Sequence, residues 1–218
     1  MKENSCNEWP VGTYGLPQTN TGCPEAAGVT WRLGWRYHDT EDDDSNNHWS
    51  SGLHFPSGYW RNNMYQKFCM KTSYWEGSGT WPAGNYCIFK KGGCPSGFQS
   101  GEVFWDDEDS RNANRAGGER PDGQYDLDTL IQYCCRNDGS TYNYISLPAA
   151  RPFYLFRYGS RCQNVDKMNV WDEYFRWDDE DDDNTDRVGG AHPYDSGGGA
   201  NHKLHYCYYW PSLFYYFF

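Results

Sequence analysis

One short acidic phrase occurs three times in this chain, and its repetition constrains the fold more than any other feature. Each copy has the form D-x-E-D, and eight residues after its first Asp stands an Asn or Asp, followed by His or Arg. A Trp-Pro or Leu-Pro step precedes each copy, at positions 9, 81 and 147, so the copies are 72 and 66 residues apart. Self-similarity at such a spacing sets the architecture, which predicts one domain of three divergent units.

The repeat also organises the 218-residue chain. We expect one domain over residues 9–209, preceded by a tail or linker remnant at residues 1–8. Residues 210–218 are interpreted as an aromatic C-terminal tail that packs on the domain. No leader pattern is visible at Met1, so we expect that a leader or a larger upstream region has been removed. The three units are expected to span residues 9–72, 81–136 and 147–209.

The composition indicates an all-β fold. Aromatic residues make up 19% of the chain and Gly occurs 24 times, whereas apolar residues at helical spacing are scarce. Aromatic side chains favour pleated, half-buried surfaces, and clusters of Gly and Pro bound short strands. We therefore predict an all-β domain with pseudo-threefold symmetry, similar to a β-prism or, alternatively, a β-trefoil. The expected strands are residues 12–16, 29–37, 49–55, 65–71, 85–89, 102–105, 125–127, 130–136, 153–157, 174–177 and 203–209.

Nine cysteines in a chain of this size are typical of an oxidising compartment and of structural disulfides. The spacing from the first to the last Cys of a unit is 46, 40 and 45 residues. Equivalent positions of a repeat are expected to form equivalent bonds. A zinc site is not expected, because the closely spaced Cys pairs of such sites are missing. The predicted bonds are Cys23–Cys69, Cys162–Cys207, Cys94 with Cys134 or Cys135, and Cys87 with the other of that pair.

The formal net charge of −11 weighs against nucleic acid and against anionic lipid as partners, because both repel an acidic surface. No apolar run of 18 residues is present, so no membrane-spanning helix is expected. The acidic residues gather in the three phrases, which makes these loops candidate sites for a cation.

Three interpretations of the acidic phrases stay open. Ca²⁺ takes about six to eight oxygens from Asp, Glu, Asn and backbone carbonyls, which each phrase supplies, although the residue order of an EF-hand is missing. Alternatively, and as the favoured interpretation, Arg115 and Arg187 neutralise the carboxylates in structural salt bridges. The third interpretation is direct contact with a ligand. Calcium is thus a candidate cofactor, with candidate ligands Asp39, Glu41, Asp42, Asn47, Asp106, Glu108, Asp109, Asp178, Glu180, Asp181 and Asp186.

Aromatic side chains are the other candidates for ligand binding. Indole and phenol rings stack on the apolar faces of sugars and tolerate water at their edges. Burial in the core is the favoured interpretation for any one Trp, but the Trp residues are too many for one small core. Some are therefore expected to lie exposed beside the acidic loops. The candidate ligand-binding residues are Trp35, Trp49, Trp105, Trp177, Asn114, Arg115 and Arg187.

The acidic phrases also suggest a glycosidase, because such enzymes use a pair of carboxyl groups, here with Glu108 or Glu180. Acidic runs are far more often solvated than catalytic, however, and neither a Gly-x-Ser-x-Gly step nor a Cys–His signature occurs. We therefore predict a binding protein that is not an enzyme. A glycoside hydrolase acting on peptidoglycan is the alternative, and an extracellular adhesion domain with a sticky aromatic C-terminus is a second one.

Specific runs of residues give the chain a family resemblance. It resembles the C-terminal domain of apextrin, the ApeC family of invertebrate immune proteins, over about residues 9–209. The family's eight shared cysteines correspond to all those of the predicted bonds, and Cys6 lies outside this pattern. The third unit departs from the pattern, because it opens with Leu147-Pro148 instead of Trp-Pro. The runs that carry the resemblance are WPVGTYGLPQTNTGCP, WPAGNYCIFKKGGCPSGF, VFWDDED, PDGQYDLDTLIQYCCRNDG, PFYLFRYGSRCQNV, GGAHPY and HYCYY.

The resemblance implies a lectin-like, pattern-recognition role in innate immunity. It implies a domain that is secreted or stored in secretory vesicles and that binds bacterial peptidoglycan, its muramyl peptides or other bacterial surface glycans. Some members carry an upstream pore-forming module, which implies such a module as a partner in a longer precursor. These statements are expectations of the resemblance, and the residues alone do not identify the ligand.

Overall fold

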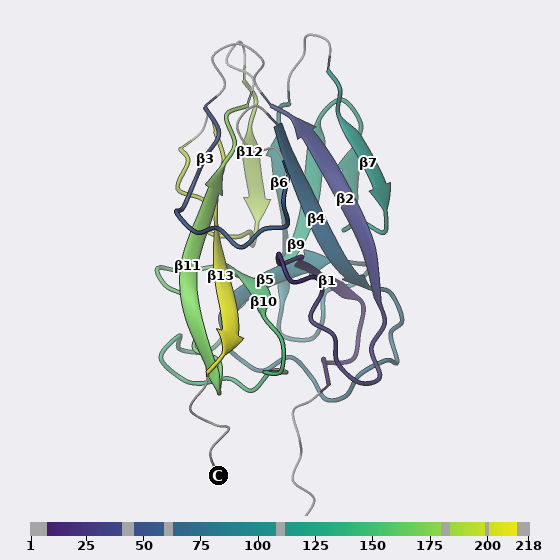
Figure 1. Cartoon of the computed structure of the whole chain (residues 1–218), viewed down its shortest axis with the longest axis vertical. Helices are drawn as coiled ribbons and strands as arrows, with labels where there is room; N and C mark the ends of the chain where they lie inside the picture. Colours follow the sequence, from purple (N-terminus) through teal and green to yellow (C-terminus); the bar gives the residue numbers. More distant parts are fainter. Residues whose placement is uncertain are drawn as a thin grey trace, which may run out of the picture.

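The computed structural model of the protein describes residues 8–40, 46–58, 63–107, 112–179, 184–198 and 201–212. Within these residues the chain forms 13 strands and no helix, which is the all-β class that the composition predicts (Figure 1). The strands are β1 (Tyr14–Pro17), β2 (Trp31–Asp39), β3 (His48–Trp49), β4 (Asn63–Lys71), β5 (Asn85–Lys90), β6 (Gln99–Trp105), β7 (Arg115–Gly118), β8 (Gly123–Tyr125), β9 (Thr129–Asn137), β10 (Phe153–Arg157), β11 (Met168–Arg176), β12 (Arg187–Gly190) and β13 (Lys203–Pro211).

One pattern of antiparallel pairing occurs in three sets of strands. In each set the last long strand lies between two earlier strands and pairs with both. β4 lies between β1 and β2, β9 between β5 and β6, and β13 between β10 and β11. Each set belongs to one of the three segments that the sequence repeat marks, although β9 and β13 extend one and two residues beyond the predicted units.

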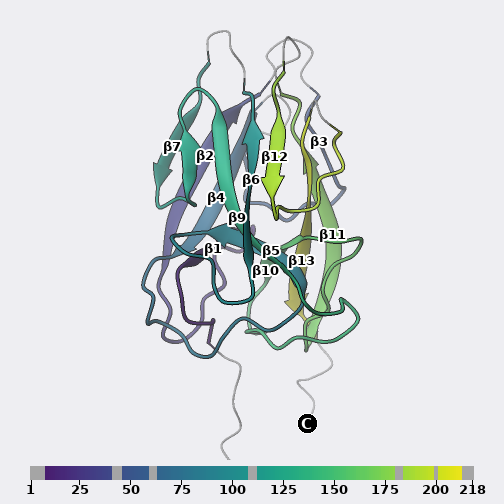
Figure 2. The ribbon, with the colours of Figure 1, turned by 180° about the vertical axis from the view of Figure 1, so that it is seen from behind.

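Strands that cross between the sets join them into one open sheet. β5 pairs with both β1 and β10, so the first strands of the three sets lie side by side. The short strands pair with the second strand of another set: β7 with β2, β12 with β6, and β3 with β11. Figure 2 shows β6, β9 and β12 from the side opposite to that of Figure 1. Each set therefore receives one strand from another set.

Every predicted strand overlaps an observed strand, but only residues 153–157 have the predicted bounds, and β11 begins six residues before its expected start. The expected strand at 49–55 is reduced to His48–Trp49, because the chain turns where the backbone N–H of Leu53 donates to the carbonyl of Ser50 at 3.3 Å. At the other end of the chain, β13 continues through Trp210 to Pro211, so the first residues of the expected tail belong to the sheet. Residues 213–218 of that tail lie outside the described residues.

Aromatic side chains fill two clusters of buried residues. One contains Trp105, Trp177 and Phe175, and the other contains the residues that open the three units, Trp9, Trp81 and Leu147. The rings of Trp9 and Trp81 lie 5.9 Å apart between centroids. Such large rings bury much apolar surface at the cost of few rotatable bonds, which compensates for the scarcity of aliphatic residues.

Four disulfides cross-link the sheet and agree with the pairing predicted from the repeat. Cys23–Cys69, Cys94–Cys134 and Cys162–Cys207 join equivalent positions, with Cα–Cα distances of 5.6, 5.5 and 5.6 Å. Cys87–Cys135 is the fourth bond and joins residues that stand opposite each other on β5 and β9. The structure thereby assigns the two adjacent cysteines: Cys134 pairs with Cys94, and Cys135 with Cys87. Four disulfides are consistent with an extracellular protein.

Candidate functional site

The three acidic phrases begin at one end of the molecule. In the first phrase the first Asp is the last residue of β2, and in the second and third phrases it follows β6 and β11 within two residues. These three strand ends lie together at the top of Figure 1, opposite the end from which the C-terminal strand leaves the sheet. We call Asp39, Asp106 and Asp178 the first-position aspartates.

Each first-position aspartate is held by a different unit through two hydrogen bonds, which together we call the clasp. Its backbone N–H donates to a side-chain oxygen in another unit, that of the residue eight positions after the first Asp, which we call the +8 residue. Its carboxylate accepts a hydrogen bond from the backbone N–H of the residue that precedes this +8 residue. The N–H distances to the +8 side chain are 2.7 Å for Asp39–Asn114, 2.8 Å for Asp106–Asp186 and 2.7 Å for Asp178–Asn47. The return bonds to the carboxylates come from Ala113, Thr185 and Asn46 at 2.5, 2.7 and 2.7 Å.

The clasp gives the first-position aspartates and the +8 residues a structural use. A carboxylate that accepts backbone N–H bonds is stabilised without a metal ion. Within the described ranges, no group of three or more His, Cys, Asp or Glu side chains is placed to hold a metal. The remaining calcium candidates lie outside the described residues: Glu41, Asp42, Glu108, Asp109, Glu180 and Asp181.

The second position of each phrase points into the protein, and Thr40, Asp107 and Asp179 are fully buried. Asp107 is well neutralised: its carboxylate lies 3.4 Å from the guanidinium of Arg36 and 3.2 Å from Nδ1 of His38. Asp107, Asp179 and Arg36 were not among the site residues predicted from the sequence, because they stand next to the conspicuous acidic residues or inside a strand. Side chains alternate between the two faces of an extended chain, so the neighbour of an exposed residue points inwards. This alternation was the signal in the sequence that could have identified the buried second position.

The third unit differs from the other two at a buried contact. Nδ2 of Asn47 donates to Thr40, and Nδ2 of Asn114 donates to Asp107, both at 2.9 Å. The third unit has Asp186 at this place, and it faces Asp179, so two carboxyl groups meet where the other units have a donor. Burial and the neighbouring charge of Asp186 raise the pKa of Asp179 well above its ordinary value. Burial raises the pKa of Asp186 to about 6, against the opposing effect of His202. Both carboxyl groups therefore hold their protons to a higher pH than exposed aspartates do.

The salt bridges predicted for Arg115 and Arg187 are not present among the described residues. Both side chains are exposed, and the guanidinium of Arg187 lies over the ring of Phe104, 3.6 Å from its centroid. The described cationic partners of the acidic phrases come instead from within strands: Arg36 of β2 contacts Asp107, and Arg176 of β11 contacts Asp178 at 3.1 Å. The other acidic residues of the phrases lie outside the described residues, so a salt bridge of Arg115 or Arg187 with one of them stays a prediction.

Two of the four predicted Trp platforms are buried. Trp105 and Trp177 have no exposed surface and form a triangle with His38, with centroid distances of 5.4, 5.9 and 5.3 Å. A buried indole has no free face for a sugar, so the binding role predicted for these two is not available in this structure. Trp35 packs on Tyr65 at 5.5 Å and Trp49 stacks on Phe175 at 6.1 Å, and both remain half-buried.

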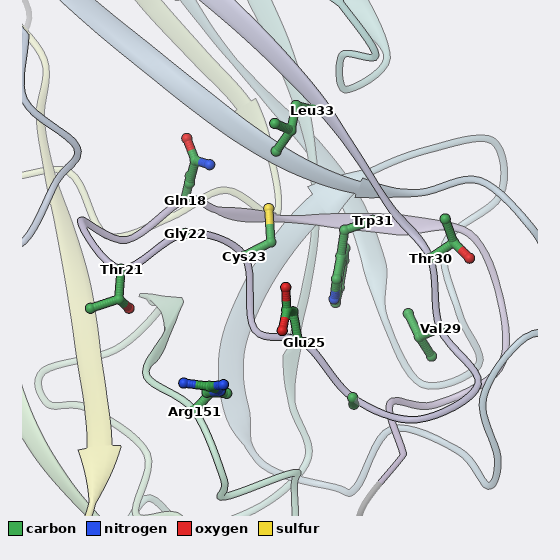
Figure 3. Close-up of a pocket in the computed structure, with 11 residues that line it drawn as sticks. Gln18, Thr21, Gly22, Cys23, Glu25, Val29, Thr30, Trp31, Leu33 and Arg151 are labelled. Atoms are coloured by element: carbon green, nitrogen blue, oxygen red, sulfur yellow. The ribbon is translucent and has the colours of Figure 1, made fainter.

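An open pocket of about 780 Å³ lies beside the Cys23–Cys69 disulfide, away from the acidic phrases. Residues between Gln18 and Leu33 form most of its wall, and Arg151, from another part of the chain, completes the wall (Figure 3). In Figure 3 the carboxylate of Glu25 lies between the indole of Trp31 and Arg151. The indole is fixed by its Nε1–H, which donates to the carbonyl of Pro24 at 2.9 Å.

The pocket combines side chains that suit a polar ligand with an apolar face. An indole presents a flat apolar surface, a guanidinium binds carboxylates, and an amide such as that of Gln18 both donates and accepts. Glu25 and Arg151 also line this pocket. They stand 126 positions apart in loops, and nothing in the sequence predicts that they share a site. Only folding brings them together.

The fold and the cross-links define the class: an all-β domain with four disulfides, in which no described segment forms a helix able to cross a membrane. The family model for ApeC, the C-terminal domain of apextrin, matches residues 9–209 of 218. The chain therefore belongs to the ApeC family. Neither the curated proteins nor the solved structures contain a match to this chain.

Proposed function

We propose that this domain is a secreted pattern-recognition module of innate immunity that binds bacterial peptidoglycan through the pocket at Trp31 and Arg151. Membership of the ApeC family and the four disulfides support an extracellular role. The observation that carries the choice of ligand is the pocket itself, in which an indole and a guanidinium line one open cavity.

Muramyl peptides match this combination of side chains. Each carries an N-acetylated pyranose ring, whose apolar face fits an indole, and a peptide that ends in carboxylates, which a guanidinium binds with charge-assisted hydrogen bonds. Glu25 and Gln18 are placed in the same pocket to accept hydrogen bonds from sugar hydroxyls and amide N–H groups. A neutral glycan such as chitin offers the ring without the carboxylates.

We further propose that the domain has pseudo-threefold symmetry of the β-prism kind. The recurring set of three strands, the three cross-set pairings and the clasp all support this arrangement. The pocket does not follow the repeat, because its side chains come from the first unit and from the atypical opening of the third. One ligand site for each domain is therefore expected from this pocket.

Sedimentation with insoluble peptidoglycan, with chitin as the control, tests the proposed function. The protein is expected to sediment with peptidoglycan and to stay in solution with chitin. Arg151→Gln is expected to weaken peptidoglycan binding about tenfold, the equivalent of about 1.4 kcal/mol. Arg161→Gln is the matched control, because Arg161 stacks on Tyr142 and does not line the pocket. Equal binding to both polymers, or no binding to peptidoglycan, would reject the proposal.

We propose that the domain binds the glycan without cutting it. A suspension of bacterial cell walls is then expected to keep its turbidity in the presence of the protein. Clearing of the suspension that is lost on Glu108→Gln or Glu180→Gln would favour the glycosidase alternative.

A further inference from the structure

Three side chains on one face of β11 and β13 form a continuous hydrogen-bonded chain that the proposed function does not use. Oγ of Ser196 lies 2.9 Å from Nε2 of His205, and Nδ1 of the same ring lies 3.2 Å from Oδ1 of Asp172. His205 stands on β13, Asp172 on β11, and Ser196 in the loop that leads into β13. A serine, a histidine and a carboxylate in this order are the parts of a serine nucleophile with its general base.

The contacts suit one arrangement of protons on a neutral imidazole. An ionised carboxylate only accepts hydrogen bonds, so Nδ1 of His205 carries the proton that is donated to Asp172. Nε2 is then the free acceptor, and the hydroxyl of Ser196 donates to it. Burial alone would raise the pKa of Asp172, but the hydrogen bond from His205 and the charge of Arg157 lower it below its ordinary value. Arg157 also forms a salt bridge with Asp172, which holds the carboxylate in place.

The loop that carries Ser196 is held at both ends. The backbone N–H of Ser196 donates to the carbonyl of Lys203 at 3.0 Å. The Oδ1 atom of Asp195 accepts the N–H of Gly197 at 2.9 Å and that of Lys203 at 2.8 Å. The N–H of His205 donates to the carbonyl of Tyr194 at 3.2 Å. These bonds place nucleophile and base in contact before any substrate arrives, which is the condition for an activated serine.

Ser196 is also accessible. The serine is exposed to solvent. The side chain of His205 is only 13% exposed, so most of its surface is covered by protein. The serine therefore stands at the surface, where an acyl group on a larger molecule can reach it.

We propose that Ser196 is the nucleophile of an acyl-transfer site for small, unhindered carboxylic esters, with His205 as its general base and Asp172 as a positioning residue. The hydroxyl oxygen adds to the ester carbonyl as its proton passes to Nε2 of His205. The tetrahedral intermediate then expels the alcohol, which takes that proton, and an acyl-serine remains. Water repeats the two steps, releasing the carboxylic acid and the free serine. A catalytic triad is recognised by geometry, so the missing Gly-x-Ser-x-Gly step does not exclude it.

Active-site labelling of the whole chain tests this assignment directly. The protein is incubated with a fluorophosphonate probe, and the modified residue is located by mass spectrometry. The label is expected on Ser196 and to be absent from Ser196→Ala. His205→Gln is expected to slow labelling by about 100-fold or more, the usual contribution of a general base. Ser140 is the internal control, because it is an exposed serine whose hydroxyl oxygen accepts the N–H of Tyr142 and, in the part of the chain that the structure describes, contacts no histidine.

Two variants of Asp172 separate a positioning role from a structural one. Asp172→Asn is expected to slow the labelling of Ser196, because an amide that presents its N–H to Nδ1 favours the wrong tautomer of His205. Asp172→Glu keeps the carboxylate and is expected to retain part of the rate. Unchanged melting temperatures show that the variants are folded. Labelling of Ser196 no faster than of Ser140, or labelling unaffected by His205→Gln, would overturn the proposal.

Discussion

At the scale of single residues, the three units do the same structural task with different chemistry at the +8 position. Asn47 and Asn114 accept a backbone N–H with their oxygen and donate with their nitrogen, so each satisfies both sides of its contact. Asp186 keeps the acceptor but has no N–H to offer to Asp179. The third unit can make the same contact only by retaining a proton, which makes its stability depend on pH.

Asp186→Asn is expected to stabilise the protein at neutral pH. A carboxyl group whose pKa is higher in the folded than in the unfolded protein stabilises the fold below its unfolded pKa, and this contribution is lost as pH rises through the folded pKa, about 6 for Asp186. The wild type should therefore lose stability between about pH 4 and pH 7 relative to the variant. The new amide is expected to donate to Asp179 as Asn114 does to Asp107, a gain of about 1 kcal/mol at pH 7.5.

Thermal unfolding of both proteins at pH 4.5 and pH 7.5 checks this prediction. Burial lowers the pKa of His202, but its hydrogen bond with Asp195 and the charge of Asp186, 3.7 Å away, raise it to a net increase. The difference between the two proteins therefore reports the change at Asp186 together with its effect on His202. A variant that is no more stable than the wild type at pH 7.5 would show that the pair carries no such cost.

At the scale of strands, the sequence predicted part or all of every long strand and missed the short strands β7 and β12, which depend on partners. β2, β4 and β9 have runs of aromatic and alternating residues that mark strands locally. β7 and β12 carry little such signal, since β7 is Arg-Ala-Gly-Gly and β12 is Arg-Val-Gly-Gly. They form strands because they pair with the edge of a strand from another unit, and local propensity contains no information on that partner. The same holds for the pocket, whose Arg151 is brought in from a distant loop.

Glycines at the edge of β2 and β6 permit these cross-unit pairings. A Cβ on Gly34 would lie 1.6 Å from the carbonyl oxygen of Glu119, and one on Gly101 would lie 2.2 Å from that of Ala191. Both contacts are with the chain that follows the short strand of another unit. Gly101→Ala should therefore push β12 away from β6 and destabilise the protein by about 1–3 kcal/mol.

Urea unfolding measures this effect, with Gly93→Ala as the matched control. A Cβ on Gly93 would meet no atom within 4 Å, so that substitution should leave the midpoint nearly unchanged. If Gly101→Ala unfolds at the same urea concentration as Gly93→Ala, β12 does not pack on β6 as described.

At the scale of the whole molecule, the acidic end is held together by hydrogen bonds among the units. Because the first-position aspartates bind backbone N–H groups and Asp107 is neutralised by Arg36, we expect this end to need no calcium. Melting curves in chelator and in millimolar calcium should then share one midpoint. A midpoint that rises by several degrees with calcium, as the logarithm of its concentration, would assign the ion a structural site.

Binding of muramyl peptides in the pocket at Trp31 and Arg151 is tested by an NMR titration of the ¹⁵N-labelled protein with muramyl dipeptide. Trp31→Phe assigns the indole N–H signal of Trp31. This signal is expected to shift saturably, with about tenfold weaker affinity in Arg151→Gln, while the signal of the exposed Trp171 on β11 stays unchanged. A Trp31 signal that does not move at millimolar ligand, or moves no more than that of Trp171, would contradict it.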